Sequence, residues 1–378
     1  MGGVSMEWKE VRLGDILNFR RGHDLPHSAM KPGNIPVAGS NGVIGYHDTA
    51  TPMKPILTIG RSGNVGKPYF YEEAWAHNTT LYVDDFKGND PKFLYYLCQT
   101  MPFANFGGGS AVPTLNRNHI HPLETKIPVN VEDQRRIASI LSSLDRKIEL
   151  NNKINADLEE MAQAIFKNWF VDFEPFKDGK FVDSELGMIP EGWKVGSPYE
   201  YVKVVYGAPY KSAKFNDNGD GLPLIRIRDL KSCNPQFYTP EILPQTEYVN
   251  MGDIVAGMDA EFVPHIWKGK TGLLNQRVCK LMPQQTSISN LFVLYLMKPE
   301  LEFVQSYKTG TTVSHLGKAD IDKFVVVLPP LKVVEECSKI LDSILQRIKN
   351  ISAESRNLST LRDTLLPRLM SGELEVPE

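Results

Sequence analysis

Short apolar runs separated by turn residues fill two blocks of the chain, residues 6–130 and 191–330. Segments such as PILTIG, LYVDD, GDIVAG and FVVVLP lie between clusters of Gly, Pro and Asn, a pattern that predicts short β-strands. Residues 93–101 and 290–298 have helical patterns and are expected to form short helices beside these strands. Each block is therefore predicted to be a mixed α/β domain.

A long helical pattern follows each block, beginning near Glu132 and again near Lys332. In both patterns a column of positions seven apart is almost wholly apolar, and a sustained heptad of this kind is typical of a coiled coil. The two columns, offset by 200 residues, are Ile137, Leu144, Asn151, Leu158 and Ile165, and then Cys337, Ile344, Ile351, Leu358 and Leu365. Flanking apolar positions that widen the stripes are Ile140, Ile154, Met161, Ile340, Leu341, Ile348, Leu361 and Leu369.

These stripes have two interpretations: the helices pair with each other, or each stripe faces its own globular block. Pairing makes the helices antiparallel, because the first leads away from one block and the second has to return from the other. Asn151, polar within its column, then either fixes the register of the pair or lies exposed at a frayed seam.

Five short matches in the same order indicate that the chain contains an internal repeat. The offset between matched segments grows from 185 to 201 residues, as loop insertions in two diverged copies would produce. The matches are 7–9 with 192–194, 55–60 with 252–257, Asn78 with Asn275, 109–115 with 310–316, and 127–128 with 328–329. We predict an α+β protein with two mixed α/β domains, separated by a long antiparallel two-helix coiled coil and related by a pseudo-twofold axis. The alternative is that common α/β punctuation produces the matches by coincidence.

Composition is that of a globular protein of two or three domains: 378 residues, 42% hydrophobic and 23% charged. There is no apolar run long enough for a transmembrane helix and no secretory signal, and the first five residues are expected to be a cloning remnant before a native Met6. The four cysteines are scattered, which favours reduced thiols and a cytoplasmic protein. A net charge of −3 argues against nucleic-acid binding, but the excess acid lies in 131–190 and 331–378, so net charge does not decide the matter.

Motifs for catalysis are not found. GRSGNVGKPY, residues 60–69, lacks the first glycine of a P-loop and has Pro68 where a magnesium-binding hydroxyl is needed. His119 and His121 have no nearby Cys or Asp, so a surface loop is favoured over a metal site. We expect no catalytic residue, no metal and no cofactor in this chain.

With no catalytic motif found, binding of another molecule is the remaining kind of function. Loops after the predicted strands carry side chains that are suitable for binding DNA. Arg reads guanine and Asn or Gln reads adenine through paired hydrogen bonds, while Lys contacts phosphates. The alternative for each residue is an ordinary solvated surface position. The candidates are Arg20, Arg21, Arg61, Ser62, Asn64, Lys67, Asn78, Ser110, Thr114, Asn116, Arg117, Lys211, Lys214, Arg226, Arg228, Asp259, Gln276, Arg277, Thr311, Thr312, Ser314 and His315.

Over residues 6–378 the chain resembles the DNA-specificity subunit of type I restriction–modification systems. The resemblance is carried by EWKEVRLGDI, DQRRIASILSSLDRKIELNN, AIFKNWFVDFEPF, LGMIPEGWK and TLRDTLLPRLMSGELEV. It implies that 6–130 and 191–330 are target-recognition domains, each of which reads one half of a split, asymmetric DNA sequence. It also implies spacer helices at 131–170 and 331–372, with a linker at 171–190.

The partners that the resemblance implies are double-stranded DNA, two modification (methyltransferase) subunits and motor–nuclease restriction subunits. S-adenosylmethionine, ATP and Mg²⁺ would belong to those partners, which methylate adenine and cleave DNA. The family has no universal base-contacting residues, so the candidate list rests on the loops alone.

Two other functions remain open: a stand-alone DNA-binding regulator, and an enzyme with unrecognised motifs. A regulator would not need protein-docking surfaces on its helices. Aromatic residues near the end of the first helix either form such a surface or pack into the core of the second block; they are Phe166, Trp169, Phe170, Phe173 and Phe176.

Overall fold

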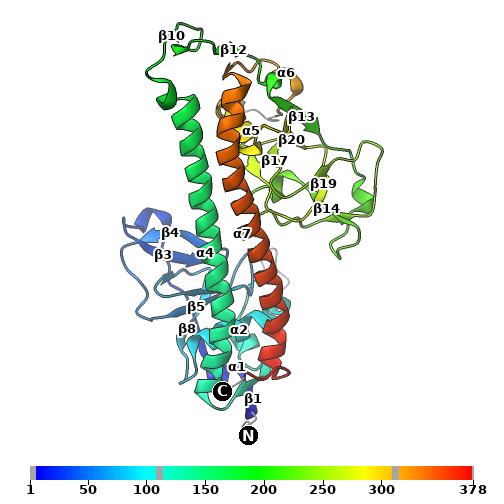
Figure 1. Ribbon diagram of the computed structural model, residues 1–378. Coiled ribbons are helices and arrows are strands. Elements are labelled where there is room, and N and C mark those ends of the chain that lie inside the picture. The colour runs from blue at the N-terminus through cyan, green and yellow to red at the C-terminus, as the bar shows by residue number, and fades with distance from the viewer. Residues whose placement is uncertain (1–5, 108–113, 309–314, 377–378) are drawn as a thin grey trace, which may run out of the picture. The chain divides into compact units, whose positions relative to one another are not determined.

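A computed structural model describes residues 6–107, 114–308 and 315–376, and these divide into two compact units (Figure 1). Unit 1 comprises Met1–Ile148 with Asn357–Glu378, and unit 2 comprises Glu149–Arg356. The division crosses both long helices, so each unit contains one part of each helix. These helices are α4 (Val131–Phe170) and α7 (Leu331–Ser371).

Unit 1 contains a four-stranded sheet in the order β2-β8-β5-β6, a three-stranded sheet in the order β4-β3-β7, and the separate pair β1-β9. Its strands are β1 (Trp8–Arg12), β2 (Asn18–Arg21), β3 (Ile35–Gly39), β4 (Gly42–His47), β5 (Ile56–Gly60), β6 (Pro68–Tyr71), β7 (Trp75–Ala76), β8 (Thr80–Asp85) and β9 (Glu124–Pro128). Its short helices are α1 (Leu13–Ile16), α2 (Pro91–Thr100) and α3 (Arg117–Ile120).

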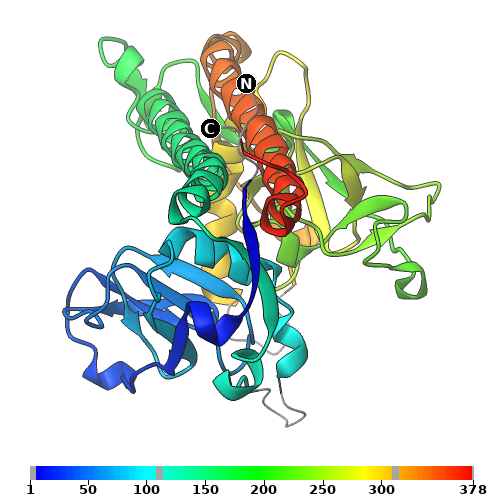
Figure 2. The same cartoon turned by 90° about the horizontal axis from the view of Figure 1, so that it is seen from below.

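The core of unit 1 forms where the first sheet meets α2 and the start of α4. The β5 sequence is buried along its whole length, which explains its nearly continuous apolar run. Helix α2 begins where Asp90 accepts a hydrogen bond from the Phe93 amide (2.8 Å), with Pro91 in the first turn. Figure 2 shows β1, in blue, passing the red end of α7, where the ring of Trp8 lies against Gly372.

Unit 2 contains two four-stranded sheets, in the orders β13-β20-β17-β18 and β15-β14-β19-β16, and two strand pairs, β12-β21 and β10-β11. Its strands are β10 (Phe181–Val182), β11 (Ile189–Pro190), β12 (Lys194–Gly196), β13 (Val202–Tyr206), β14 (Leu222–Ile225), β15 (Tyr238–Thr239), β16 (Tyr248–Val249), β17 (Ile254–Gly257), β18 (His265–Ile266), β19 (Gly272–Leu274), β20 (Val278–Pro283) and β21 (Val326–Leu328). Its other helices are α5 (Asn290–Lys308) and the single-turn α6 (Lys318–Ile321).

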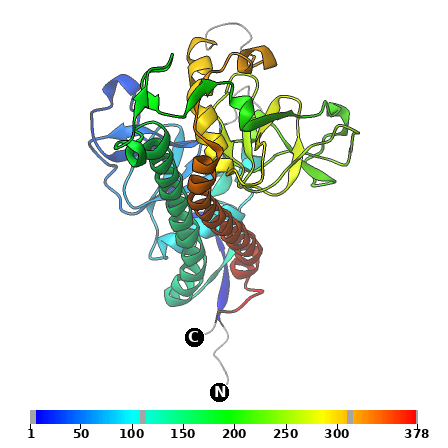
Figure 3. The ribbon, with the colours of Figure 1, turned by 45° about the horizontal axis from the view of Figure 1, so that its top comes forward.

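Helix α5 is longer than the sequence pattern predicts. The expected end at residue 298 stands just before Pro299, but the helix continues through this proline to Lys308. Leu301 and Val304, beyond the proline, are buried in the core of unit 2. Their burial offsets the backbone hydrogen bond that proline cannot donate. Figure 3 shows α5, in yellow, beside the first turns of α7.

The two units repeat the same topology. In each unit an early strand pairs with the strand that precedes the long helix: β1 pairs with β9, where Lys9 lies opposite Ile127, and β12 pairs with β21, where Lys194 lies opposite Leu328. A parallel strand pair also recurs, β3 with β7 and β14 with β19. The internal repeat inferred from the sequence is therefore present in the structure of the units.

The long helices contact each other in both units. In unit 2 the Asn151 side chain donates to Glu354 (2.8 Å) and the Asn155 side chain donates to Ser352 (3.0 Å), so the helices run antiparallel there. Asn151 is 1% exposed, so the interpretation of a solvent-exposed frayed seam is wrong. In unit 1 the Arg362 guanidinium donates to Asp145 (2.8 Å).

The two heptad columns differ in burial along their length. Ile137 lies in the core of unit 1, and Cys337, Ile344 and Ile351 are buried in unit 2. Half-buried column positions are Leu144, Leu158, Ile165, Leu358 and Leu365. Three flanking residues expected in the stripe are instead exposed, because they lie at its solvent edge; they are Met161, Ile340 and Leu361.

The aromatic residues at the end of α4 belong to the core of unit 2. Phe166 packs against Phe292 (5.7 Å between ring centroids), and Phe170 packs against Trp193 (6.0 Å). Phe173 and Phe176 contact the same tryptophan, and Trp169 contacts Phe170 and Phe176. Core packing is therefore confirmed for Phe166 and Phe170, which are buried, whereas Trp169, Phe173 and Phe176 are half-buried at the edge of this core. Among the described residues, no helix is long and apolar enough to cross a membrane.

Candidate nucleic-acid interface

Backbone hydrogen bonds bring four segments of unit 1 together at one edge of its four-stranded sheet: the end of β2, the turn after β5, the start of β8 and the segment before α3. The Gly22 amide donates to Thr80 O (3.0 Å), the Arg61 amide to Thr79 O (2.8 Å), and the Leu115 amide to Arg61 O (2.7 Å). We call this edge rim 1. The candidates on its segments are Arg20, Arg21, Arg61, Ser62, Asn78, Thr114, Asn116 and Arg117.

Acidic partners hold several of the rim 1 cations. Arg20 forms an ion pair with Asp84 (3.2 Å), and Arg21 forms one with Asp24 (3.0 Å). Asn78 also donates to Asp24, and this hydrogen bond, ahead of the charge of Arg21, lowers the pKa of the Asp24 carboxyl. Both arginine side chains are more than half exposed, so they are held in place while remaining accessible.

Other unit 1 candidates have structural partners. Asn116 caps α3 by accepting a hydrogen bond from the Asn118 amide (3.0 Å), and the Arg117 guanidinium donates to Phe19 O (3.2 Å). Lys67 lies over the ring of Tyr69, 5.3 Å from its centroid, and Asn64 is exposed in the turn after β5.

Unit 2 builds the corresponding edge, rim 2, with equivalent bonds. The Gly207 amide donates to Val278 O (3.2 Å), the Met258 amide to Arg277 O (2.9 Å), and the Leu316 amide to Met258 O (2.7 Å). Gly22 on rim 1 and Gly207 on rim 2 are equivalent residues. At each of them an added Cβ would collide with a facing backbone carbonyl, so both positions require glycine.

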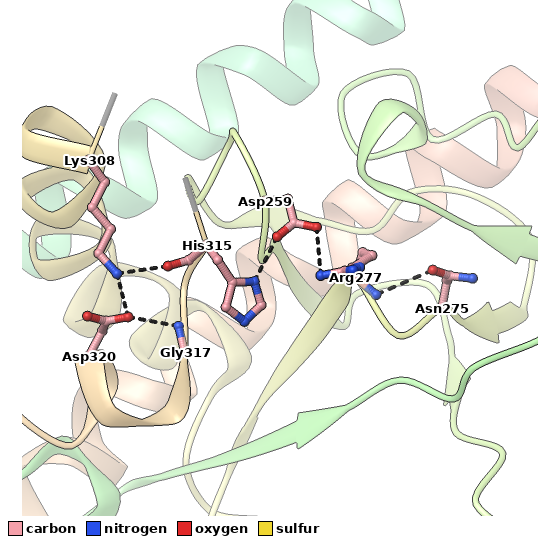
Figure 4. Close-up of polar contacts among 7 residues, drawn as sticks. All are labelled: Asp259, Asn275, Arg277, Lys308, His315, Gly317 and Asp320. Carbon is pink, nitrogen blue, oxygen red and sulfur yellow. Dashed lines mark hydrogen bonds and ion pairs between the residues drawn. The ribbon is translucent and has the colours of Figure 1, made fainter. Parts of the chain in front are cut away.

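Asp259 is the centre of a charged cluster on rim 2 (Figure 4). One carboxylate oxygen lies 2.7 Å from His315 Nδ1, and the other lies 3.2 Å from the Arg277 guanidinium. The Arg277 amide in turn donates to the Asn275 side chain (3.3 Å). Arg277 is 55% exposed and His315 45%, against 29% for Asp259. The carboxylate is therefore covered by two groups that face solvent.

A second group of bonds fixes the chain segment that carries His315. Lys308 donates to His315 O (2.8 Å) and to the Asp320 carboxylate (2.6 Å), which also accepts from the Gly317 amide (2.8 Å). Burial would raise the pKa of Asp320, but the bonds from Lys308 and Gly317 outweigh it and hold this pKa below its usual value. Figure 4 shows the ammonium of Lys308 between the two acceptors.

The remaining unit 2 candidates lie on the loops around the second sheet. The Lys211 amide and the Lys214 ammonium both bind Glu241, at 2.9 and 3.1 Å, and these two bonds, the first one foremost, lower the pKa of that carboxyl. Arg226 stacks over the ring of Phe237, with 5.2 Å to its centroid. Arg228 and Gln276 are exposed. Ser110, Thr311, Thr312 and Ser314 lie outside the described residues.

Three acidic partners at these sites and the alignment of one position were not predicted from the sequence. Asp259 was a candidate, but Asp24, Asp84 and Glu241 were not, because the sequence gives no signal for acidic partners that lie far away along the chain. Asn275 was matched with Asn78, yet the equivalent of Asn275 is His77: each forms the isolated parallel bridge of its unit. A one-residue difference in the preceding loop produces this shift.

The two histidines singled out in the sequence, His119 and His121, lie in different environments. His121 Nε2 accepts a hydrogen bond from the Phe19 amide (3.1 Å), and burial, ahead of the neighbouring cations, lowers the pKa of this ring. His119 is exposed. Within the described ranges, no group of three or more His, Cys, Asp or Glu side chains is placed to hold a metal ion.

Comparison with known proteins identifies the family of the chain. Residues 6–160 and 190–358 match the family model described as "Type I restriction modification DNA specificity domain", so the chain belongs to that family. It is similar to the Type I restriction enzyme MjaIX specificity subunit of Methanocaldococcus jannaschii, with 29% identity over 76% of this chain and 70% of that protein. It is also similar to the HindI specificity subunit of Haemophilus influenzae, with 24% identity over 96% of this chain and 94% of that protein.

A solved structure shares the fold. The crystal structure of the type I restriction–modification system S subunit from M. genitalium covers 97% of this chain and 96% of its own, with a TM-score of 0.58 and 15% identity. The match to the family model confirms the identification of the chain as a member of the specificity-subunit family, which was made from its motifs.

Proposed function

We propose that this chain is the non-catalytic subunit that gives a type I restriction–modification complex its DNA sequence specificity. In this proposal blocks 6–130 and 191–330 are the two target-recognition domains, and each reads one half of a split, asymmetric site. The observation that carries the proposal is the pair of rims. They share backbone bonding but carry different side chains, as two readers of different half-sites require.

The long helices have the role of a spacer in this proposal. Segments 131–170 and 331–372 form one antiparallel coiled coil joined to the second domain by the linker 171–190, and the domains are related by an approximate twofold axis. Support comes from the cross-helix bonds of Asn151, Asn155 and Arg362. Twofold-related readers address sites about one DNA turn, ~34 Å, or multiples of it apart.

Partners supply the chemistry. Two methyltransferase subunits bring S-adenosylmethionine and methylate adenine, and motor–nuclease subunits bring ATP and Mg²⁺. This chain contributes no cofactor, and the complex works on DNA in the cytoplasm.

Charge favours this proposal over a stand-alone DNA-binding regulator. The net charge is −3, and Asp24, Asp84 and Glu241 neutralise cations at the candidate interface. Affinity for DNA depends largely on Lys and Arg neutralising phosphates, so weak binding is expected from the chain alone. A partner with its own basic surface would supply the missing affinity.

The proposal is tested by co-expressing the chain with a modification subunit encoded beside it and mapping methylated adenines in the host DNA. We expect the two proteins to co-purify and to methylate one split motif, which disappears when this chain is omitted. Methylation that persists without the chain, together with failure to co-purify, would refute the proposal and favour the regulator.

A further inference from the structure

We propose that Arg277 reads a guanine in the half-site bound by unit 2, and that Asp259 positions it for this contact. This inference rests on the proposed function and goes further, because it names the residues and the base. It follows from a comparison of the two rims position by position, and from the charges that surround Arg277.

Asp259 and His315 occupy the same places in unit 2 as Ser62 and Thr114 occupy in unit 1. Each pair forms an isolated antiparallel bridge within its own unit. Beside each bridge the same backbone bond recurs with the same length: Leu115 N to Arg61 O, and Leu316 N to Met258 O, both 2.7 Å.

Arg277 in unit 2 is the equivalent of Thr79 in unit 1. The Arg61 amide donates to Thr79 O (2.8 Å), and the Met258 amide donates to Arg277 O (2.9 Å). In both units the backbone amide at this position donates a hydrogen bond to the side chain two residues earlier. His77 Nδ1 accepts from the Thr79 amide (3.4 Å), and Asn275 Oδ1 accepts from the Arg277 amide (3.3 Å).

The same frame therefore carries two different sets of side chains. Unit 1 presents three hydroxyl groups, and unit 2 presents a carboxylate, a guanidinium and an imidazole. Hydroxyl groups donate or accept and distinguish bases poorly, whereas a guanidinium forms a paired hydrogen bond with guanine. The unit 1 set is Ser62, Thr79 and Thr114, and the unit 2 set is Asp259, Arg277 and His315.

Asp259 restricts the side chain of Arg277. An arginine that is 55% exposed has many rotamers, and the carboxylate oxygen 3.2 Å away restricts them before DNA arrives. The same carboxylate is itself anchored by His315 at 2.7 Å, on a segment fixed through Lys308 (Figure 4). Pre-organisation of this kind lowers the entropy cost of a base contact.

The carboxylate also favours a base over a phosphate as the target. A phosphate that approached Arg277 would meet the negative charge of Asp259, and such like charges repel. A G·C pair presents acceptors on guanine and an amino donor on cytosine, so a guanidinium beside a carboxylate complements it. The chemistry that fits rim 2 is thus the major-groove edge of a G·C pair.

The test uses the complex of this chain with its modification subunits and a panel of duplexes that vary one base of the methylated motif at a time. Arg277→Gln is expected to lose discrimination at one guanine by roughly tenfold or more, with the other half of the motif unchanged. Asp259→Ala is expected to relax the same base to a smaller extent. Glu200→Gln, which removes an exposed ion pair with Lys194 elsewhere in unit 2, is the matched control and is expected to change nothing.

Three results would overturn the inference: unchanged specificity in Arg277→Gln, a loss spread over both halves of the motif, or a unit 2 half-site without a G·C pair. If Asp259→Ala reduces the rate on every duplex equally, its role is structural and the positioning role is refuted. These failures leave the wild-type motif intact. Failure of the proposed function is different, because then the wild-type chain directs no methylation at all.

Discussion

Asn155 on α4 donates a side-chain hydrogen bond to Ser352 on α7 (3.0 Å), and both side chains are buried. Asn151, one turn earlier, makes a similar bond to Glu354 (2.8 Å). Apolar contacts between helices tolerate sliding, whereas a buried polar pair is satisfied at one alignment. These two bonds therefore specify the register of the helices within unit 2.

Removing one partner of the Asn155–Ser352 pair should destabilise the fold more than replacing both partners. We expect Asn155→Ala to lower the free energy of unfolding by about 1–3 kcal/mol, because it leaves the Ser352 hydroxyl buried without its donor. The double variant Asn155→Leu with Ser352→Ala should recover much of this loss. Urea denaturation of the full chain measures both; equal losses in the single and double variants would contradict this role.

The ion pair of Asp145 with Arg362 is expected to contribute more to the free energy of unfolding than the exposed pair of Arg368, on the same helix α7, with Glu373, which follows the helix. Asp145 also accepts a hydrogen bond from the Tyr96 hydroxyl (2.5 Å), and both charged side chains are about three-quarters buried. Arg362→Met should lower the free energy of unfolding by roughly 1–3 kcal/mol. The control is Arg368→Met, which breaks the exposed pair with Glu373 and should cost below about 1 kcal/mol.

The aromatic cluster at the end of α4 is expected to stabilise unit 2. Phe170 is 7% exposed and contacts Phe166, Trp193 and Phe292. Phe170→Ala should lower the free energy of unfolding by about 3–5 kcal/mol, whereas Met161→Ser, at an exposed position of the same helix, should change it by less than about 0.5 kcal/mol. Similar stability in both variants, measured by thermal or chemical denaturation, would show that the cluster is not core.

His121 should make the stability of unit 1 depend on pH. Its folded-state pKa is lowered from 6.5, chiefly by burial, and its neutral Nε2 accepts the Phe19 amide. Since the unfolded chain binds the proton more tightly, this contribution is complete above pH 6.5 and is lost as pH falls through the folded pKa. His121→Gln should flatten the dependence between neutral and mildly acidic pH, measured as the free energy of unfolding at each pH.

The matched control is His119→Gln, at an exposed position two residues away. It should leave the pH profile of the wild-type chain unaltered. If His119→Gln flattens the profile and His121→Gln does not, the assignment of the dependence to the buried ring is wrong.

The long helices and the internal repeat were predictable from the sequence. The long helices were expected near Glu132 and Lys332 and begin at Val131 and Leu331, because apolar periodicity and the preceding proline-rich strand ends both act locally. The internal repeat was also predictable from the sequence, because its matched segments are short stretches, such as 55–60 and 252–257, whose apolar and glycine pattern is similar in the two copies. The extension of α5 past Pro299 was not, because it depends on burial of Leu301 and Val304 by distant elements.

The candidate interface was readable only in part. Loop position indicated Arg20, Arg277 and His315, but it gave no sign that Asp84 or Asp259 would bind them. An ion pair between Arg20 and Asp84 joins residues 64 positions apart in sequence, and nothing in the local composition encodes it. Such partners become visible only when the sheet brings its strand ends together.

Separate reading of the two half-sites is tested by replacing residues 191–330 with the corresponding block of another family member and mapping the methylated motif of the assembled complex. We expect one half of the split motif to change to that of the donor, while the other half and the gap are retained. A change in both halves, or in neither, would contradict the claim that each block reads its own half of the site.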